Sequence, residues 1–117
     1  MKTLDQYETI FKALSDKSRL RIIKMLQRKS LCVCEITDTL KLATSTVSKH
    51  LSILREAGLI TDEKDGKWIN YKINQNPKDN IVSNALLFIQ LQLEGDELIE
   101  NDKNSISCID RKVLCCK

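Results

Sequence analysis

Five cysteines are the residues of this chain whose type and spacing could do chemistry. Cys32 and Cys34 form a Cys-x-Cys pair, and three more cysteines stand near the end of the sequence: Cys108, Cys115 and Cys116. Thiolates select soft metal and metalloid ions, and an odd number of cysteines does not suit a closed disulfide framework. All five are therefore predicted metal ligands, and structural disulfides are not expected to hold the fold together.

The Cys-x-Cys pair stands at the beginning of a short predicted helix over residues 32–40, with Val33, Ile36 and Leu40 as its apolar face. A helix N-terminus generally lowers the pKa of a thiol and favours the thiolate that binds metal. Side chains two positions apart do not face each other on an intact helix. For both sulfurs to hold one ion, we expect the first turn to be non-helical or to unwind. The alternative is that both cysteines are small buried hydrophobic residues.

The elements that must position the cysteines are predicted to be mostly helices, because the chain is rich in Leu, Ile, Lys and Glu and only 4% aromatic. Apolar spacing predicts a helix over residues 4–14 and a second that begins after Ser15 and Asp16, which can cap it. The polar face of the second helix carries basic side chains: Lys17, Arg21, Lys24 and Arg28. After the Cys-x-Cys helix and a tight connection, a longer helix is expected to be capped by Thr44 and ended by Gly58.

Asp65 and Gly66, between two alternating runs, predict a β-hairpin. Asn76 and Pro77 are expected to begin the last long helix, which Gly95 closes. The whole order predicts a winged helix-turn-helix, mainly α with a small β-hairpin. Residues 1–95 are the expected DNA-binding and dimerisation domain, and residues 96–117 are an expected cysteine-containing tail that is loosely ordered.

The helix after residue 43 presents an outer face of small hydroxyls and one lysine, with no acid between residues 41 and 55. Such side chains can meet phosphates or base edges in a groove, and the positive helix N-terminus favours phosphate. The predicted DNA-binding residues are Thr44, Ser45, Thr46, Ser48, Lys49, His50 and Ser52, with Lys64 and Lys67 from the hairpin. The alternative is an ordinary solvated surface helix.

Three aromatic side chains in this region have simpler roles. His50 is the only histidine and lacks a partner histidine, so a structural or phosphate-contacting role is favoured over metal binding. Trp68 and Tyr71 are expected to pack the hairpin on the core rather than stack on bases. Lys72 is expected to join the other hairpin lysines along the phosphate backbone.

The charge distribution also favours a nucleic-acid partner. The net charge is +3, but residues 12–29 carry seven basic side chains against Asp16, and residues 94–110 carry six acidic ones against Lys103. Scattered charge on a helical surface is the alternative. No stretch approaches the roughly 18 apolar residues of a membrane span, and no secretory signal is visible. We therefore expect a cytoplasmic protein without a membrane partner, where thiols stay reduced.

Three segments resemble signatures of the ArsR/SmtB family of metal-sensing repressors. Residues 13–23 (ALSDKSRLRII) are similar to its early-helix signature, and residues 48–60 (SKHLSILREAGLI) to its recognition-helix signature. Residues 31–36 (LCVCEI) resemble the metal box of its thiolate-sensing branch. The resemblance covers roughly residues 5–93.

The resemblance implies a homodimer that binds an inverted-repeat operator in double-stranded DNA, with the first and last long helices at the dimer interface. It also implies repression without ligand and release of DNA on metal binding. Within the family the arsenite-sensing branch is favoured, so arsenite, As(III), is the expected inducer. Cd(II), Pb(II) and Sb(III) are the alternative ions.

The sequence departs from one arsenite-sensor pattern at its third thiolate. That pattern continues with a third cysteine three residues after the second, where this chain has Thr37. Arsenite prefers three thiolates, so the tail cysteines are the available further donors, from the same chain or from its partner. A site shared with the tail, two separate sites, and a two-thiolate site tuned to methylated arsenicals all stay open.

Other branches and classes fit the residues less well. The cadmium/lead branch usually adds cysteines from an N-terminal extension, and none precedes Cys32; the zinc branch uses histidines on the last helix, and residues 77–95 contain none. A thiol redox switch would close a disulfide between Cys115 and Cys116, or from the tail to Cys34. An enzyme is not expected, because the chain has no Cys-x-x-Cys and no glycine-rich phosphate loop. A metal carrier that never binds DNA is the remaining alternative.

Overall fold

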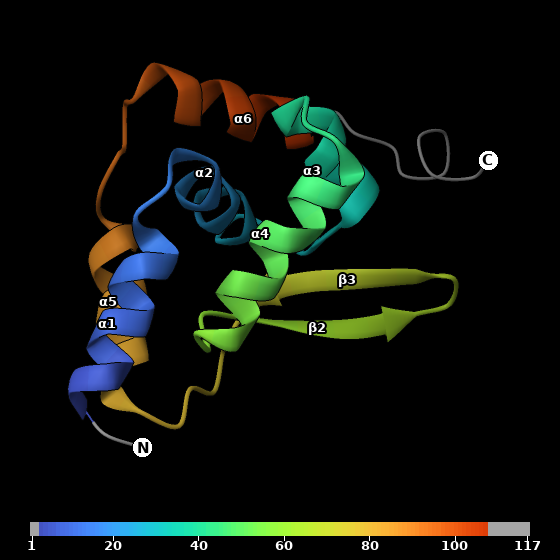
Figure 1. The fold of residues 1–117 in the computed structure, drawn as a ribbon. Helices are drawn as coiled ribbons and strands as arrows, with labels where there is room; N and C mark the ends of the chain where they lie inside the picture. The colour runs from blue at the N-terminus through green and yellow to red at the C-terminus, as the bar shows by residue number, and fades with distance from the viewer. Residues whose placement is uncertain (1–2, 108–117) are drawn as a thin grey trace.

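The helix-turn-helix and hairpin signals of the sequence correspond to real elements in the computed structural model, which describes residues 3–107 (Figure 1). In chain order the elements are α1 (Thr3–Leu14), α2 (Lys17–Leu26), β1 (Leu31–Cys32), α3 (Val33–Leu40), α4 (Thr44–Glu56), β2 (Ile60–Asp65), β3 (Trp68–Ile73), α5 (Asn80–Gln90) and α6 (Glu97–Ser107). α3, a tight turn and α4 precede the β2–β3 hairpin, which projects away from the helices. The predicted fold class, mainly α with a winged helix-turn-helix, is confirmed.

Local sequence signals account for several of the boundaries. The Asp16 side chain accepts a hydrogen bond from the Arg19 N–H at 3.1 Å and caps α2, as predicted. Gly58 after α4 and Gly66 in the hairpin turn have φ values of +82° and +62°, in the left-handed region that favours glycine. Both glycine predictions are therefore confirmed.

Two predicted helix starts are wrong. The residue before α4 that acts as its N-cap is Ala43, and Thr44 is already the first helical residue. α5 begins at Asn80 with Asp79 as N-cap, rather than at Asn76 and Pro77, because the chain after the hairpin runs through a short irregular segment first. α5 also ends at Gln90, short of the predicted closure at Gly95.

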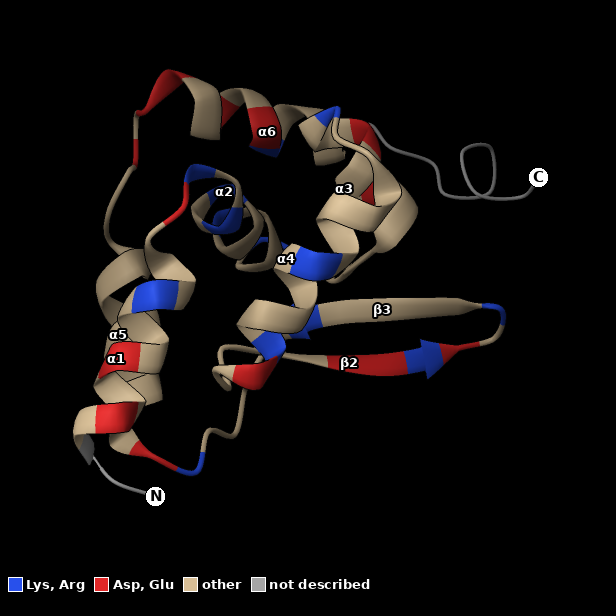
Figure 2. Cartoon of the chain, viewed as in Figure 1, with Lys and Arg blue, Asp and Glu red and all other residues tan. Residues whose placement is uncertain are grey.

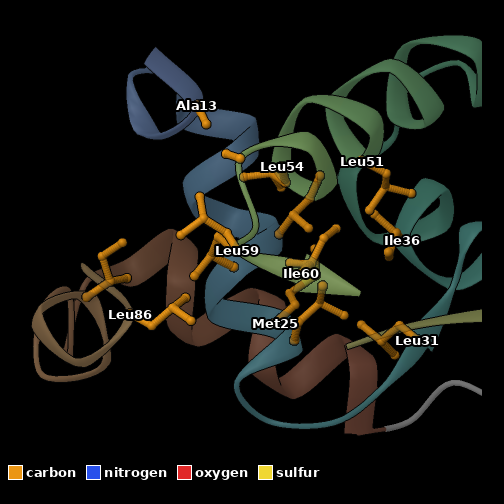
Figure 3. Packing of buried hydrophobic residues seen from close by; sticks show 14 of the residues in the cluster. Ala13, Met25, Leu31, Ile36, Leu51, Leu54, Leu59, Ile60 and Leu86 are labelled. Atoms are coloured by element: carbon orange, nitrogen blue, oxygen red, sulfur yellow. The ribbon is translucent and has the colours of Figure 1, made fainter. Parts of the chain in front are cut away.

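The core forms around α2, whose apolar side chains Ile22, Ile23, Met25 and Leu26 are buried. Figure 3 shows Met25 together with Leu31, Ile36, Leu51 and Ile60, which come from β1, α3, α4 and β2 and point into one cluster. The sheet has the strand order β1–β3–β2 with both pairs antiparallel. The two-residue strand β1, which the sequence did not predict, joins the segment before α3 to the hairpin.

The segment after residue 95 differs from its prediction. Residues 96–117 were expected to be loosely ordered, but Glu97–Ser107 forms α6, which packs on α2 and α3 (Figure 1). Its buried side chains are Ile99, Asp102 and Ile106. Cys108, Cys115 and Cys116 lie outside the described residues. The division of the chain at residue 95 into two functional parts stays a prediction.

α6 and the end of α5 cover two of the four basic side chains on the polar face of α2, Arg21 and Lys24, whereas Lys17 and Arg28 are exposed. Nε and Nη2 of Arg21 donate to the two carboxylate oxygens of Asp102 at 2.8 and 2.9 Å, and this hydrogen bonding raises the pKa of Arg21. Lys24 is 3% exposed and its Nζ donates to the carbonyls of Ile89, Gln90 and Gln92. A lysine in this position donates to carbonyls of the last turn of α5 and of the segment after it, which is a favourable place for a cation.

A smaller ion-pair network joins α6 to the segment after α5. Lys103 Nζ lies 2.6 Å from one oxygen of Glu94, and this hydrogen bond raises the pKa of Lys103 and lowers that of Glu94.

Within residues 3–107, none of the helices combines the length and apolar character needed to cross a membrane.

The buried ion pair predicts how α6 contributes to stability. Asp102→Ala removes the partner of a largely buried Arg21 and should lower the free energy of unfolding by about 3 kcal/mol, because an uncompensated charge is left in a desolvated site. Urea denaturation followed by circular dichroism, at one fixed protein concentration, measures the change. Asn101→Ala, at an exposed neighbouring position, is the control and should shift stability by less than about 0.5 kcal/mol. An equal effect of the two variants would contradict this role of Asp102.

Candidate nucleic-acid interface and thiolate site

α4 has the two-faced character expected of a helix that lies on the core and reads a groove. Val47, Leu51 and Leu54 are at most 1% exposed and hold the helix on the core. The opposite face carries the predicted DNA-binding residues, of which Thr44, Ser45, Thr46, Ser48 and Lys49 are exposed and His50 and Ser52 half-buried. The first turn of α4 contains no acidic residue. This end of the helix can therefore accept an anion.

The imidazole of His50 is in contact with the guanidinium of Arg19 from α2. Nη1 of Arg19 lies 3.1 Å from Nδ1 of the imidazole. The same guanidinium donates to the carbonyls of Ala13 and Lys12, in the last turn of α1. Partial burial raises the pKa of Asp16, but the hydrogen bond from the Arg19 N–H and the positive charge of Arg19 lower it by more. The pKa of Asp16 therefore lies below the ordinary value for an aspartate. The sequence prediction identified His50 but missed Arg19, whose role depends on a contact 31 positions away.

One of the three hairpin lysines forms an ion pair within the hairpin. Figure 2 shows basic residues at the turn between β2 and β3 and acidic residues along β2. Lys64 and Lys67 are exposed, as a phosphate contact requires. Lys72 instead lies 3.5 Å from a carboxylate oxygen of Glu63 and is paired within the hairpin.

The two hairpin aromatics have different positions. Tyr71 packs against the hydrophobic core, as predicted. Trp68 begins β3 at the tip of the hairpin, opposite Asp65, and Nζ of Lys67 lies 5.2 Å from its ring centroid. It is not among the residues of the described part that pack on the core, so the prediction that it joins the hairpin to the core is wrong.

Cys32 is the N-cap of α3 and also the last residue of β1. Its backbone is extended (φ −91°, ψ 169°), so the start of the Cys-x-Cys motif is non-helical, as one of the two predicted possibilities requires. Its N–H donates to Oε1 of Glu35 at 2.9 Å, and its side chain accepts from the Glu35 N–H in a reciprocal capping box. The pairing of Cys32 with Asn70 links the same residue to the hairpin strand β3.

The two thiols of the motif are in different environments. Cys32 is 2% exposed, whereas Cys34, in the first turn of α3, is exposed to solvent. Residues 3–107 contain no group of three or more His, Cys, Asp or Glu side chains arranged to hold a metal ion. Thr37, which takes the place of a third cysteine, has a buried hydroxyl that finds no hydrogen-bond partner in the described part of the chain. The three tail cysteines fall beyond that part, so the five-cysteine ligand set stays a prediction.

α1 and α5 lie side by side and leave a large apolar surface uncovered (Figure 1). Phe11, Phe88 and Leu91 are 65%, 67% and 72% exposed. A hollow of about 570 Å³ between the two helices is lined mainly by apolar side chains of both. Contiguous exposed apolar surface of this kind is a candidate interaction site.

Comparison with known proteins assigns a family to this arrangement. Residues 16–62 match the family described as "Bacterial regulatory protein, arsR family". The chain is 40% identical over 95 residues to the "Arsenical resistance operon repressor" of Bacillus subtilis, covering 80% of this chain and 90% of that protein.

Two further likenesses bear on function and fold. The chain is 34% identical over 79 residues to the "Cadmium resistance transcriptional regulatory protein CadC homolog" of Staphylococcus aureus, which covers 67% of this chain and 65% of that protein. In structure it is similar to HlyU from Vibrio cholerae, with a TM-score of 0.62, 27% identity, and coverage of 79% of this chain and 98% of that one.

The capping box at the start of α3 can be tested directly. Glu35→Ala should lower the free energy of unfolding by about 2 kcal/mol, because it leaves the buried Cys32 N–H without its acceptor. Glu35→Gln, which keeps an acceptor oxygen at this position, should cost much less. Urea denaturation compares the two variants with the parent. If both variants were as stable as the parent, the box would not stabilise the start of α3.

Proposed function

The chain belongs to the ArsR family of bacterial regulatory proteins, and on that premise we propose that it represses transcription as a dimer on an inverted-repeat operator and releases the DNA when cysteine thiolates bind arsenite. The family comprises DNA-binding transcription regulators, so the expectation that the chain is not an enzyme is confirmed. The observation that carries the proposal is the position of Cys32, a buried thiol at the junction of β1, α3 and the hairpin.

The DNA-binding part of the proposal depends on the side chains that α4 exposes to solvent. Its inner face is buried, so the helix is fixed on the core, while Ser45, Thr46 and Lys49 stand clear of it. Hydroxyls and a lysine on such a face suit a major groove and its phosphates. Lys64 and Lys67 on the projecting hairpin supply phosphate contacts beside the groove.

A second copy of this chain is the proposed occupant of the apolar face on α1 and α5. The face combines exposed Phe11, Phe88 and Leu91 with an apolar hollow between the helices. A twofold dimer buries the same patch on both subunits and presents two α4 helices, as an inverted repeat requires.

The thiolate switch follows from the cap of α3. An ion bound by Cys32 must draw a buried sulfur out of its capping box, because Cys34 is exposed and Cys32 is not. That movement disturbs α3, which leads through the tight turn into α4, and the β1 pairing with the hairpin. Both DNA-contacting elements are therefore reached from one residue.

Arsenite is favoured as the inducer by thiolate chemistry and by the printed name of the Bacillus relative. Arsenous acid exchanges a hydroxyl group for each thiol and releases one water per sulfur, with no change of oxidation state. We propose that one of the tail cysteines, Cys108, Cys115 or Cys116, supplies the further thiolate, from the same chain or from its partner. The cadmium-resistance relative supports Cd(II) or Pb(II) as the alternative ion.

The switch predicts a response that depends on the Cys-x-Cys motif. With reduced parent protein, saturating arsenite should weaken operator binding by between about 5- and 150-fold, the usual range of coupling between two sites. Cys32→Ser/Cys34→Ser should bind the operator without arsenite and show no release. Fluorescence anisotropy on DNA from upstream of the gene, titrated with arsenite and in parallel with Cd(II), measures both.

The outcomes separate the alternatives. Release by Cd(II) at far lower concentration than by arsenite would keep the mechanism and change the ion. If arsenite still released the Cys32→Ser/Cys34→Ser variant from the operator, the proposed switch at Cys32 would be wrong. In the same assay, Cys108→Ser tests whether Cys108 is the third donor. Release by peroxide but by neither ion would indicate a redox switch.

The dimer face predicts the effect of a charge at its centre. Phe88→Asp places a carboxylate on the exposed apolar patch and should convert the dimer into a monomer, because a buried unpaired charge costs several kcal/mol. Light scattering after size-exclusion chromatography gives the mass. Ile69→Asp, an equally drastic change at an exposed hairpin position, should leave the dimer intact. A dimeric Phe88→Asp variant would place the interface elsewhere.

A further inference from the structure

We propose that Arg19 is a positioning residue for DNA binding, which holds the neutral imidazole of His50 so that its Nε2–H donates to a phosphate oxygen of the operator. The proposal rests on the proposed function, because it specifies how α4 meets the DNA backbone. It adds a residue of α2 to an interface otherwise made by α4 and the hairpin.

The guanidinium of Arg19 is fixed on three sides. Its Nε donates to the Ala13 carbonyl at 2.7 Å and its Nη2 to the Lys12 carbonyl at 3.2 Å. These carbonyls lie in the last turn of α1, and the Lys12 carbonyl also accepts from the Ser15 N–H at 3.2 Å. The third donor, Nη1, is therefore aimed at His50 by groups that do not belong to α4. The Arg19 backbone N–H is held as well, by Asp16.

The chemistry of the two side chains then decides the tautomer. An arginine remains protonated and can only donate, so Nδ1 of His50 must be the acceptor of the 3.1 Å contact. In a neutral imidazole the other nitrogen carries the proton. Nε2 is thereby fixed as a donor, and a proton added at Nδ1 would face the guanidinium.

The surroundings of His50 fit a phosphate group. A surface hollow of about 510 Å³ is lined by Arg19, Ser45, Thr46, Lys49, His50 and Ile53. Its charged groups are two cations, Arg19 and Lys49, and its hydroxyls can also donate to an anion. Asp16, the N-cap of α2, is an acidic group close to Arg19 and His50, and its carboxylate accepts a hydrogen bond from the Arg19 N–H. The nearest ion pair of α1 is Lys12 with Glu8, on its exposed side.

Two substitutions of His50 separate the contact with Arg19 from the contact with DNA. An asparagine amide reaches about as far as Nδ1, so His50→Asn keeps an acceptor for Arg19 but offers nothing at the Nε2 position. A glutamine amide reaches the Nε2 position, so His50→Gln restores a donor there. We expect His50→Asn to weaken operator binding by at least about tenfold, as for the loss of a hydrogen bond to a charged group. His50→Gln should recover most of that loss.

The salt dependence tests the charge of the imidazole in the complex. A neutral donor releases no counterion, so His50→Asn should leave the slope of log K against log salt unchanged. If His50 were an imidazolium that neutralises one phosphate, its replacement by asparagine would reduce the magnitude of the slope by about 0.9. Lys49→Ala is the comparison, because removal of a cation should reduce the slope. A reduced slope for His50→Asn, or equal binding by the Asn and Gln variants, would overturn the proposal.

Nitrogen-15 NMR of the free protein gives an answer that does not require DNA. His50 is the only histidine, so labelled histidine yields one imidazole signal pair. In mildly alkaline solution we expect an unprotonated, hydrogen-bonded Nδ1 and a protonated Nε2, as the contact with Arg19 requires. Arg19→Lys keeps the charge but cannot serve the three acceptors together, and the Nδ1 signal should move toward that of a free imidazole. A protonated Nδ1 in the parent would refute the inference. Failure of the parent to bind any operator would instead refute the proposed function.

Discussion

The N-terminal cap of α3 is the constraint on which the functional part of the structure depends. Cys32 ends a strand, begins a helix and exchanges hydrogen bonds with Glu35, so its position fixes the direction of α3. The tight turn after α3 transmits that direction to α4, and the pairing with Asn70 transmits it to the hairpin. A sulfur in this position is therefore coupled to both elements that would meet DNA, whereas a cysteine on an exposed helix face would be coupled to neither.

Residues 3–107 expose two surfaces of different character, and Arg19 contacts the helices α1 and α4 that contribute to them. The apolar surface belongs to α1 and α5, and the polar surface to α4. Arg19 closes the C-terminus of α1 and contacts His50 of α4 with the same planar group. Arg19 therefore links the helix that carries part of the apolar surface to the helix that carries the polar one.

Local patterns in the sequence predicted most of the fold, and distant contacts account for what they missed. The apolar spacing of α1 to α4, the Asp16 cap and the Gly66 turn are all readable within a few residues. β1 escapes such a reading, because two residues become a strand only beside β3. The sequence of α6 predicts a polar, exposed segment, in part because it contains Asp102. The burial of Asp102 depends on its contact with Arg21, 81 positions earlier in the chain. For the site, the composition of α4 indicated the outer face, whereas the role of Arg19 required the fold.

The late position of α6 in the chain has a consequence for biosynthesis. Residues 97–107 leave the ribosome after every element on which they pack, and domains acquire their structure from the N-terminal side during synthesis. Until then Arg21 lacks its Asp102 partner and the cationic side of α2 is open to a cell rich in polyanions. Completion of α6 supplies the carboxylate that pairs with Arg21. The helix made last among residues 3–107 therefore provides the counterion for a cation of the second, while Ser45, Thr46 and Lys49 of α4 stay exposed.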